Sequence, residues 1–228
     1  MRPTPRTVVT VGFVSALLVP TAAQTFTLLS PARHWGSVPV AICVRDGHVS
    51  LTANDPDRGI TAVVQALNGT LPSLPGTGWN FTAVGPVVTA QPCDTPWQLG
   101  DGQPTISLVE KIKGTCTGSC LAATFTGFYS CPQGFHPGDT HCRIDDSDVE
   151  GRANKTSRNG GPYDSEYETG CTGGEYSIEG IMVHEAGHQL GLGHTNVGGA
   201  TMYPSVSSCD NGPATIAPDD TAGLDALY

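Results

Sequence analysis

The strongest constraint on the fold comes from residues 184–194, where three histidines and one glutamate stand at fixed spacings. His184 and His188 are four residues apart, so on an α-helix their side chains project from one face, a turn apart. Gly191 then allows the helix to end and the chain to turn sharply. The turn would bring His194 towards the same point. The segment therefore predicts a helix that ends at a glycine and presents three imidazoles together.

The chemistry of these side chains indicates a catalytic zinc site. Imidazole nitrogens bind Zn²⁺ at ~2.0–2.1 Å, and three protein ligands leave one position open for water. Glu185 lies on the flank of the same helix face, where it can accept a proton from that water without binding the metal. The alternative is a chance recurrence of histidines. Five residues at these offsets would arise by chance in roughly one chain in ten thousand of this length.

The amino terminus carries the pattern of a secretory signal. Arg2 and Arg6 precede an apolar stretch at residues 8–19, which is followed by small residues ending at Ala23. The stretch is too short for a membrane span, which needs roughly 20 apolar residues. We expect cleavage after residue 23 and a secreted, extracellular protein. An uncleaved signal anchor is the alternative.

Eight cysteines in an exported chain predict four disulfides. Their number alone does not determine the pairing. Zinc ligation by cysteine is the competing interpretation, but no pair has the C-x-x-C spacing of such sites. The pairs that we expect are Cys43 with Cys93, Cys116 with Cys120, Cys131 with Cys142, and Cys171 with Cys209.

Composition and charge narrow the class of protein further. Only 14% of residues are charged, while the chain holds 29 glycines and 18 prolines, which is typical of a loop-rich globular protein. The formal net charge of −10 offers no basic surface for nucleic acid. We therefore expect no nucleic-acid partner. We also expect a monomer and no membrane span, since no later segment has the length and apolarity of one.

Apolar patterns place strands first and helices around them. Val38, Val40, Ile42 and Val44 alternate as in a half-buried strand, and the other elements follow from similar patterns. The order predicts an α+β domain with a twisted mixed β-sheet. The expected strands are 35–45, one near 79–84, 105–112, 121–128 and 142–149, and the expected helices are 58–67, 177–190 and 218–227.

Residues 184–194 resemble the HExxHxxGxxH signature of the metzincin clan of metalloendopeptidases. Met202, eight residues after the third histidine, resembles the Met-turn that lies beneath the metal in that clan. Three further features resemble matrixins, the matrix-metalloproteinase-like family: Thr195, the Met-Tyr-Pro order that begins at Met202, and the closing segment 216–228.

The resemblance implies a metzincin catalytic domain over residues 35–228, after a signal peptide at 1–23 and a short segment at 24–34. The domain would contain the sheet, an active-site helix and a C-terminal helix, stapled by disulfides. A protein or peptide substrate would bind extended along the edge strand near Leu121 and Phe125.

By the same resemblance, zinc would be held by His184, His188 and His194. Glu185 would act as general base towards the zinc-activated water that hydrolyses the peptide bond. Ala123 stands where matrixins have a histidine, so we expect one catalytic zinc and no second structural zinc.

An acidic cluster near the end of the 142–149 strand is a candidate calcium site. Asp145, Asp146 and Asp148 could supply some of the about six to eight oxygen ligands that Ca²⁺ prefers. The alternative is a solvated strand end.

Two other functions are compatible with the sequence. The first is a zinc-binding surface or adhesion module without proteolysis, although such a module has no physical need for Glu185. The second is a zinc amidase acting on a non-peptide bond, because activated water attacks any amide.

Overall fold

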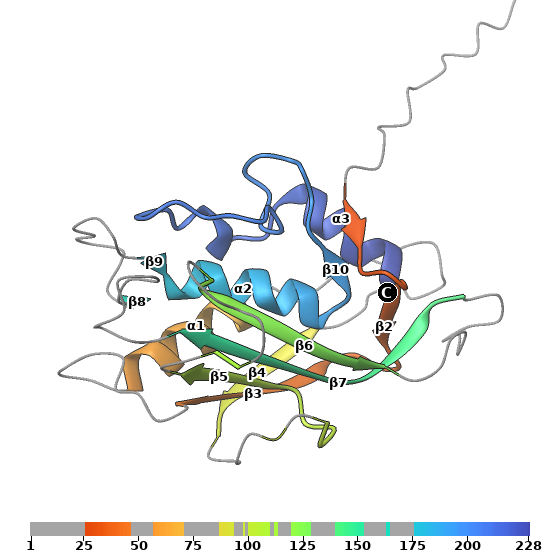
Figure 1. Cartoon of the computed structure of the whole chain (residues 1–228), viewed down its shortest axis with the longest axis horizontal. Coiled ribbons are helices and arrows are strands. Elements are labelled where there is room, and N and C mark those ends of the chain that lie inside the picture. Colours follow the sequence, from red (N-terminus) through yellow and green to blue (C-terminus); the bar gives the residue numbers. More distant parts are fainter. Residues whose placement is uncertain are drawn as a thin grey trace, which may run out of the picture.

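A computed structural model shows how these segments are arranged (Figure 1). The expected strand near 79–84 and the expected signal peptide at 1–23 lie outside the residues that it describes. In the described part of the chain, no helix combines the length and apolarity needed to cross a membrane. The described residues are 26–46, 57–70, 87–93, 98, 100–109, 112–113, 120–128, 140–152, 163–164 and 176–228.

Six strands form the main sheet, which is mixed as the sequence predicts. Its order is β2-β7-β5-β3-β4, and β6 pairs with β7. Neighbours along this path run parallel, whereas β6 runs antiparallel to β7. The strands are β2 (Arg33–Trp35), β3 (Val40–Asp46), β4 (Val88–Pro92), β5 (Thr105–Val109), β6 (Ala122–Phe128) and β7 (Cys142–Arg152).

Three α-helices confirm the predicted ones to within a few residues. They are α1 (Asp57–Thr70), α2 (Ile178–Gln189) and α3 (Pro218–Leu227), and a 3-10 turn, η2, spans Gly212–Ala214. Short strands pair β1 (Thr27–Leu28) with β10 (Leu192–Gly193), and β8 (Tyr163–Asp164) with β9 (Tyr176–Ser177). At the start of α2, the Oγ of Ser177 accepts a hydrogen bond from the backbone of Gly180 at 3.0 Å, as an N-cap should.

The core lies between the sheet and the two longer helices. α1 packs on β3 and β4, α2 packs on β6 and β7, and the two helices contact each other. Figure 1 shows α2 between the sheet and the C-terminal segment that contains α3. The apolar side chains of this core include Ile42, Ile106, Val149, Val63, Leu67 and Met182.

Hydrogen bonds at the C-terminal end of α2 fix this helix in place. The last carbonyls of a helix have no partner within the helix. The indole of Trp35 donates to the carbonyl of Gln189 at 2.8 Å, and the hydroxyl of Tyr228 donates to that of Leu190 at 3.0 Å. The buried side chain of Gln189 donates to the carbonyl of Ser147 in β7 at 2.6 Å. The helix is thereby tied both to the sheet and to segments near the two chain ends.

Strand β4 was not predicted from the sequence, which placed the strand of this region near residues 79–84. β4 carries a proline at its end and pairs with β3 alone among the described strands. On its other edge, the side-chain amide of Asn68 in α1 exchanges two hydrogen bonds with the backbone of Ala90, at 2.8 and 2.9 Å. This partner lies in a helix, so local sequence patterns could not reveal it.

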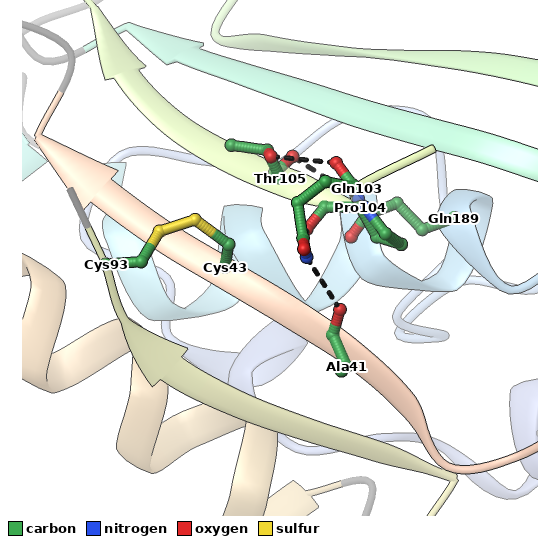
Figure 2. The surroundings of a disulfide bond; sticks show 7 residues. All are labelled: Ala41, Cys43, Cys93, Gln103, Pro104, Thr105 and Gln189. Atoms are coloured by element: carbon green, nitrogen blue, oxygen red, sulfur yellow. Dashed lines mark hydrogen bonds between the residues drawn. A yellow bond between two sulfur atoms is a disulfide. The ribbon is translucent and has the colours of Figure 1, made fainter. Parts of the chain in front are cut away.

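A disulfide between Cys43 and Cys93 joins β3 to the residue after β4, as predicted, with Cα atoms 5.6 Å apart (Figure 2). In the same view, Gln103 donates to the carbonyl of Ala41 at 3.4 Å. Cys120, Cys142 and Cys209 are also disulfide-bonded, and no described cysteine is free. The cysteines expected to pair with them (Cys116, Cys131 and Cys171) lie outside the described residues, so those pairings stay predictions.

Candidate active site

The three predicted histidines converge at one end of α2. The Nε2 atom of His194 lies 3.3 Å from that of His184 and 3.1 Å from that of His188. The turn that returns His194 needs a glycine, because Gly191 has a φ of 104°. A Cβ added there would stand 2.0 Å from the carbonyl oxygen of Arg33. Gly191 therefore meets both a conformational and a steric requirement of the turn.

Backbone carbonyls determine the orientation of the two helical imidazoles. The Nδ1 atom of His184 lies 2.6 Å from the carbonyl oxygen of Thr201, and that of His188 lies 2.8 Å from the carbonyl oxygen of Leu192. A carbonyl oxygen can only accept, so each Nδ1 carries the proton and each Nε2 keeps a lone pair. Burial, and then the neighbouring His188, lowers the pKa of His184 to about 3, which keeps this ring neutral.

This donor set fits a tetrahedral zinc ion. Nitrogens bound at ~2.0–2.1 Å in a tetrahedral arrangement stand about 3.3 Å apart. The separations from Nε2 of His194 to the other two rings match this value. Unprotonated nitrogens this close repel one another unless a cation lies between them. In the described part of the chain, these histidines are the only group of three metal-ligand residues with donor atoms within 4.8 Å.

Met202 lies against the active-site helix in a tight turn. Its side chain is 1% exposed, and a Cβ added at Gly187 would stand 2.3 Å from its sulfur. The backbone of Thr195 donates to the carbonyl of Met202 at 3.0 Å, which closes the turn against the segment of the third histidine. The resemblance placed Met202 in this position.

Sequence reasoning missed Asp220, which holds this turn from α3. The residue is 1% exposed, and its carboxylate accepts hydrogen bonds from the backbone of Thr201 at 2.6 Å and of Met202 at 3.2 Å. Acidic residues are common in the first turn of a helix because of the helix dipole, so nothing in the pattern distinguished Asp220.

Glu185 is 7% exposed, between α2 and the sheet. Its Oε2 accepts a hydrogen bond from the hydroxyl of Thr124 in β6 at 2.5 Å. Burial raises the pKa of Glu185 to about 7, and the bond from Thr124 acts in the opposite direction. A buried carboxyl with a pKa near neutrality suits proton transfer. The sequence placed Thr124 in the edge strand but gave it no role.

A cleft of about 900 Å³ opens over the histidines. Its walls come from residues 121–124 at the edge strand β6 and from residues 203–206 after the methionine turn. Ile181 and the two histidines of α2 also line the cleft. The resemblance implied a substrate along the same edge strand.

The acidic residues of the candidate calcium site lie on β7. Asp146 and Asp148, two residues apart in the strand, share a face. Both carboxylate oxygens of Asp148 are buried without a hydrogen-bond partner. Burial, followed by the charges of Asp146 and Asp101, raises the pKa of Asp148 to about 7. Asp145 lies at an irregularity of the strand, between Ile144, which pairs with Phe128, and Asp146, which pairs with Gly127. Among the described residues the three aspartates do not form a three-donor cluster.

Comparison with known protein families assigns this chain to one of them. The family model for matrixin matches residues 97–228, which is more than half of the chain. The chain belongs to the matrixin family. The match confirms the predicted fold class and a matrixin-type catalytic domain, which is that of a zinc metalloendopeptidase, a hydrolase. The domain bounds of 35–228 stay a prediction.

Individual matrixins are similar to this chain over short segments. Metalloendoproteinase 5-MMP of Arabidopsis thaliana is 45% identical over 51 residues, which cover 22% of this chain and 14% of that protein. Neutrophil collagenase of Homo sapiens is 33% identical over 66 residues (29% and 14%), and matrilysin of Rattus norvegicus is 40% identical over 48 residues (21% and 18%). The matched segments span less than a fifth of each relative.

Proposed function

We propose that this chain is a secreted zinc-dependent endopeptidase, with zinc held by His184, His188 and His194 and with Glu185 as general base. The observation that carries the proposal is the convergence of three Nε2 atoms beside a buried carboxylate. Two of these atoms belong to rings whose Nδ1 faces a backbone carbonyl, which leaves Nε2 unprotonated. A purely structural zinc site would use four protein ligands, whereas the described residues offer three at this point and these face a cleft.

The substrate would be an extended peptide paired with β6. One edge of this strand is bonded to β7, and no other described strand pairs with it. An unpaired strand edge presents N–H and C=O groups to which a peptide can add itself. The opposite wall, at residues 203–206, would contact side chains of that peptide.

The residues of this chain would each have a defined task during hydrolysis. Zinc, when bound, supplies Lewis acidity, which polarises the scissile carbonyl and makes water more acidic. Glu185 accepts a proton from the water as its oxygen attacks the carbonyl carbon. The same carboxyl then gives that proton to the leaving amine nitrogen as the C–N bond breaks. The hydrogen bonds of His184 and His188 to backbone carbonyls keep both rings oriented throughout.

Metal removal and restoration tests this proposal. The purified chain should hydrolyse a denatured protein such as casein and should hold about one zinc per chain. A chelator should abolish the activity, and added zinc should restore it. Zinc bound without cleavage of casein would contradict the proposal. Cleavage of a cell-wall preparation instead would favour the non-peptide amidase.

Secretion is the second part of the proposal. The signal pattern at residues 1–23 supports it, and so does the disulfide between Cys43 and Cys93, since such bonds persist in oxidising compartments. Sequencing the amino terminus of the exported protein should give a start at residue 24. Retention inside the cell with residues 1–23 attached would contradict secretion.

A monomeric state and the lack of a nucleic-acid partner also stay predictions.

Calcium binding at the acidic residues of β7 is a further part of the proposal. It rests on Asp146 and Asp148, which share a face of the strand, because the three predicted aspartates together do not form a donor cluster. The buried, unpaired oxygens of Asp148 support it, because a hard cation would offset their charge. Titration with calcium should give saturable binding that Asp148→Asn abolishes. Equal calcium affinity in the two proteins would show that the ion lies elsewhere.

A further inference from the structure

Thr124 lies where β6 faces the active-site helix. It stands opposite Val149 of β7, a fully buried core residue. Residues directly opposite each other in neighbouring strands share a face of the sheet. Thr124 therefore points towards α2, and its hydroxyl lies 2.5 Å from Oε2 and 3.2 Å from the carbonyl oxygen of Glu185.

The two oxygens of the Glu185 carboxylate have different surroundings. A threonine hydroxyl has one proton to donate, and the shorter distance directs it to Oε2. No described residue donates a hydrogen bond to the other oxygen, Oε1, and this oxygen is not among the buried unpaired atoms. Thr124 thus occupies one carboxylate oxygen and leaves the other open to the cleft.

A general base must be held within hydrogen-bond reach of the proton that it takes, and misplacement is costly. Glutamate reaches its carboxylate through several rotatable bonds, whereas threonine on a strand is stiff at its one side-chain torsion. A donor on a rigid strand can therefore fix a flexible base on a helix. We propose that Thr124 is a positioning residue that locks the Glu185 carboxylate through Oε2 and reserves Oε1 for proton transfer. This inference rests on the proposed role of Glu185.

Thr126 provides a matched control two residues along the same strand. It lies on the same face of β6, but its hydroxyl is 3.1 Å from the Oγ of Ser147 rather than near the carboxylate. A valine at either position removes the hydroxyl and keeps the shape and β-branching of the side chain. Comparing the two valine variants separates the contact with Glu185 from the loss of a hydroxyl on this strand.

The test measures kcat, KM, zinc content and thermal stability of four proteins: wild type, Thr124→Val, Thr124→Ser and Thr126→Val. In Thr124→Val we expect kcat to fall by about tenfold or more, as for the loss of a hydrogen bond to a charged group. KM should stay within about twofold, and zinc content and Tm should be unchanged, because binding and fold do not use this contact. The serine variant should recover most of kcat, and Thr126→Val should lose much less.

An unchanged kcat in Thr124→Val would overturn the inference. A fall that serine does not rescue, or one that follows lost zinc or a lower Tm, would also overturn it, since that pattern marks a structural role. The variant Glu185→Gln separates this inference from the proposed function. If Glu185→Gln stays active, the role of Glu185 fails. If it is inactive while Thr124→Val matches wild type, only the role of Thr124 fails.

Discussion

The Nδ1 atom of His184 lies 2.6 Å from the carbonyl oxygen of Thr201, 17 residues further along the chain. The backbone N–H of Thr201 in turn donates to the buried carboxylate of Asp220 in α3 at 2.6 Å. A single peptide segment therefore connects the C-terminal helix to an imidazole of the proposed zinc site. The orientation of that imidazole therefore depends on Thr201 and Asp220, which are not among the proposed metal ligands and do not belong to α2.

Asp220→Asn tests this connection. The asparagine keeps the shape of the side chain but loses one acceptor for the backbone donors of Thr201 and Met202. We expect the free energy of unfolding to fall by about 1–3 kcal/mol. Zinc affinity should fall by about tenfold or more, as when an outer partner of a ligand is changed. Urea unfolding and a competitive zinc titration measure the two effects. The exposed Asp210, changed to asparagine, is the control, and equal losses in the two variants would contradict the connection.

Gly191→Ala should be among the most damaging small substitutions in the chain. The residue has a φ of 104°, and the new Cβ would meet the carbonyl oxygen of Arg33 at 2.0 Å. We expect a loss of more than about 2 kcal/mol in the free energy of unfolding, together with weaker zinc binding because His194 follows the turn. Gly198→Ala, where no atom lies within 4 Å of the added Cβ, should be nearly neutral. Similar stabilities of the two variants would show that the turn tolerates a side chain.

His194→Ala should separate metal binding from folding. The variant keeps the two helical ligands, whose rings are fixed by backbone carbonyls, but loses the nitrogen that completes the set. We expect zinc affinity to fall by more than about 100-fold, beyond the effect of changing an outer partner. Metal analysis after dialysis against a zinc buffer gives the measurement. Unchanged zinc content would place the third ligand elsewhere.

The raised pKa of Asp148 predicts a specific pH dependence of the free energy of unfolding in calcium-free buffer. Its pKa is raised from 3.8 to about 7 in the folded protein, first by burial. Between these values the folded chain holds a proton that the unfolded chain has lost, so this residue makes the free energy of unfolding fall as pH rises. The effect levels off above about pH 7. Other groups add their own dependence, and the comparison with Asp148→Asn isolates this one.

At pH 8 the Asp148→Asn variant should therefore be more stable than wild type, and near pH 4 the difference should be much smaller. Thermal unfolding across this range measures it. Added calcium should raise the stability of wild type at pH 8 and not that of the variant. A constant difference between the two proteins at every pH would contradict the burial of an ionising carboxyl at this position.

The convergence of the three histidines was predictable because the residues that produce it are close in sequence. His184, His188 and Gly191 follow from the geometry of one helix and its end, and His194 lies three residues beyond the turn. Thr124 could not be found in this way, since it lies 61 residues from the carboxylate it contacts and reaches it through strand register.

Parts of the fold escaped prediction for a similar reason. The main strands and helices follow from apolar periodicity, whereas β4 gains its edge partner from the side chain of Asn68. The burial of Asp148 also depends on neighbours from other strands. In a sequence, a run of acidic residues resembles a solvated strand end. A buried acidic residue such as Asp148 can therefore be recognised only once the sheet is assembled.

The most direct test of the central claim is the turnover of a protein substrate by zinc-loaded wild type and zinc-loaded Glu185→Gln. Zinc content is measured in the same samples. The substitution keeps the shape of the side chain and removes the oxygen that accepts the proton. The account predicts equal zinc in both proteins and a kcat lower by about 10²–10⁴-fold in the variant. Equal zinc with a kcat equal to that of wild type would contradict it.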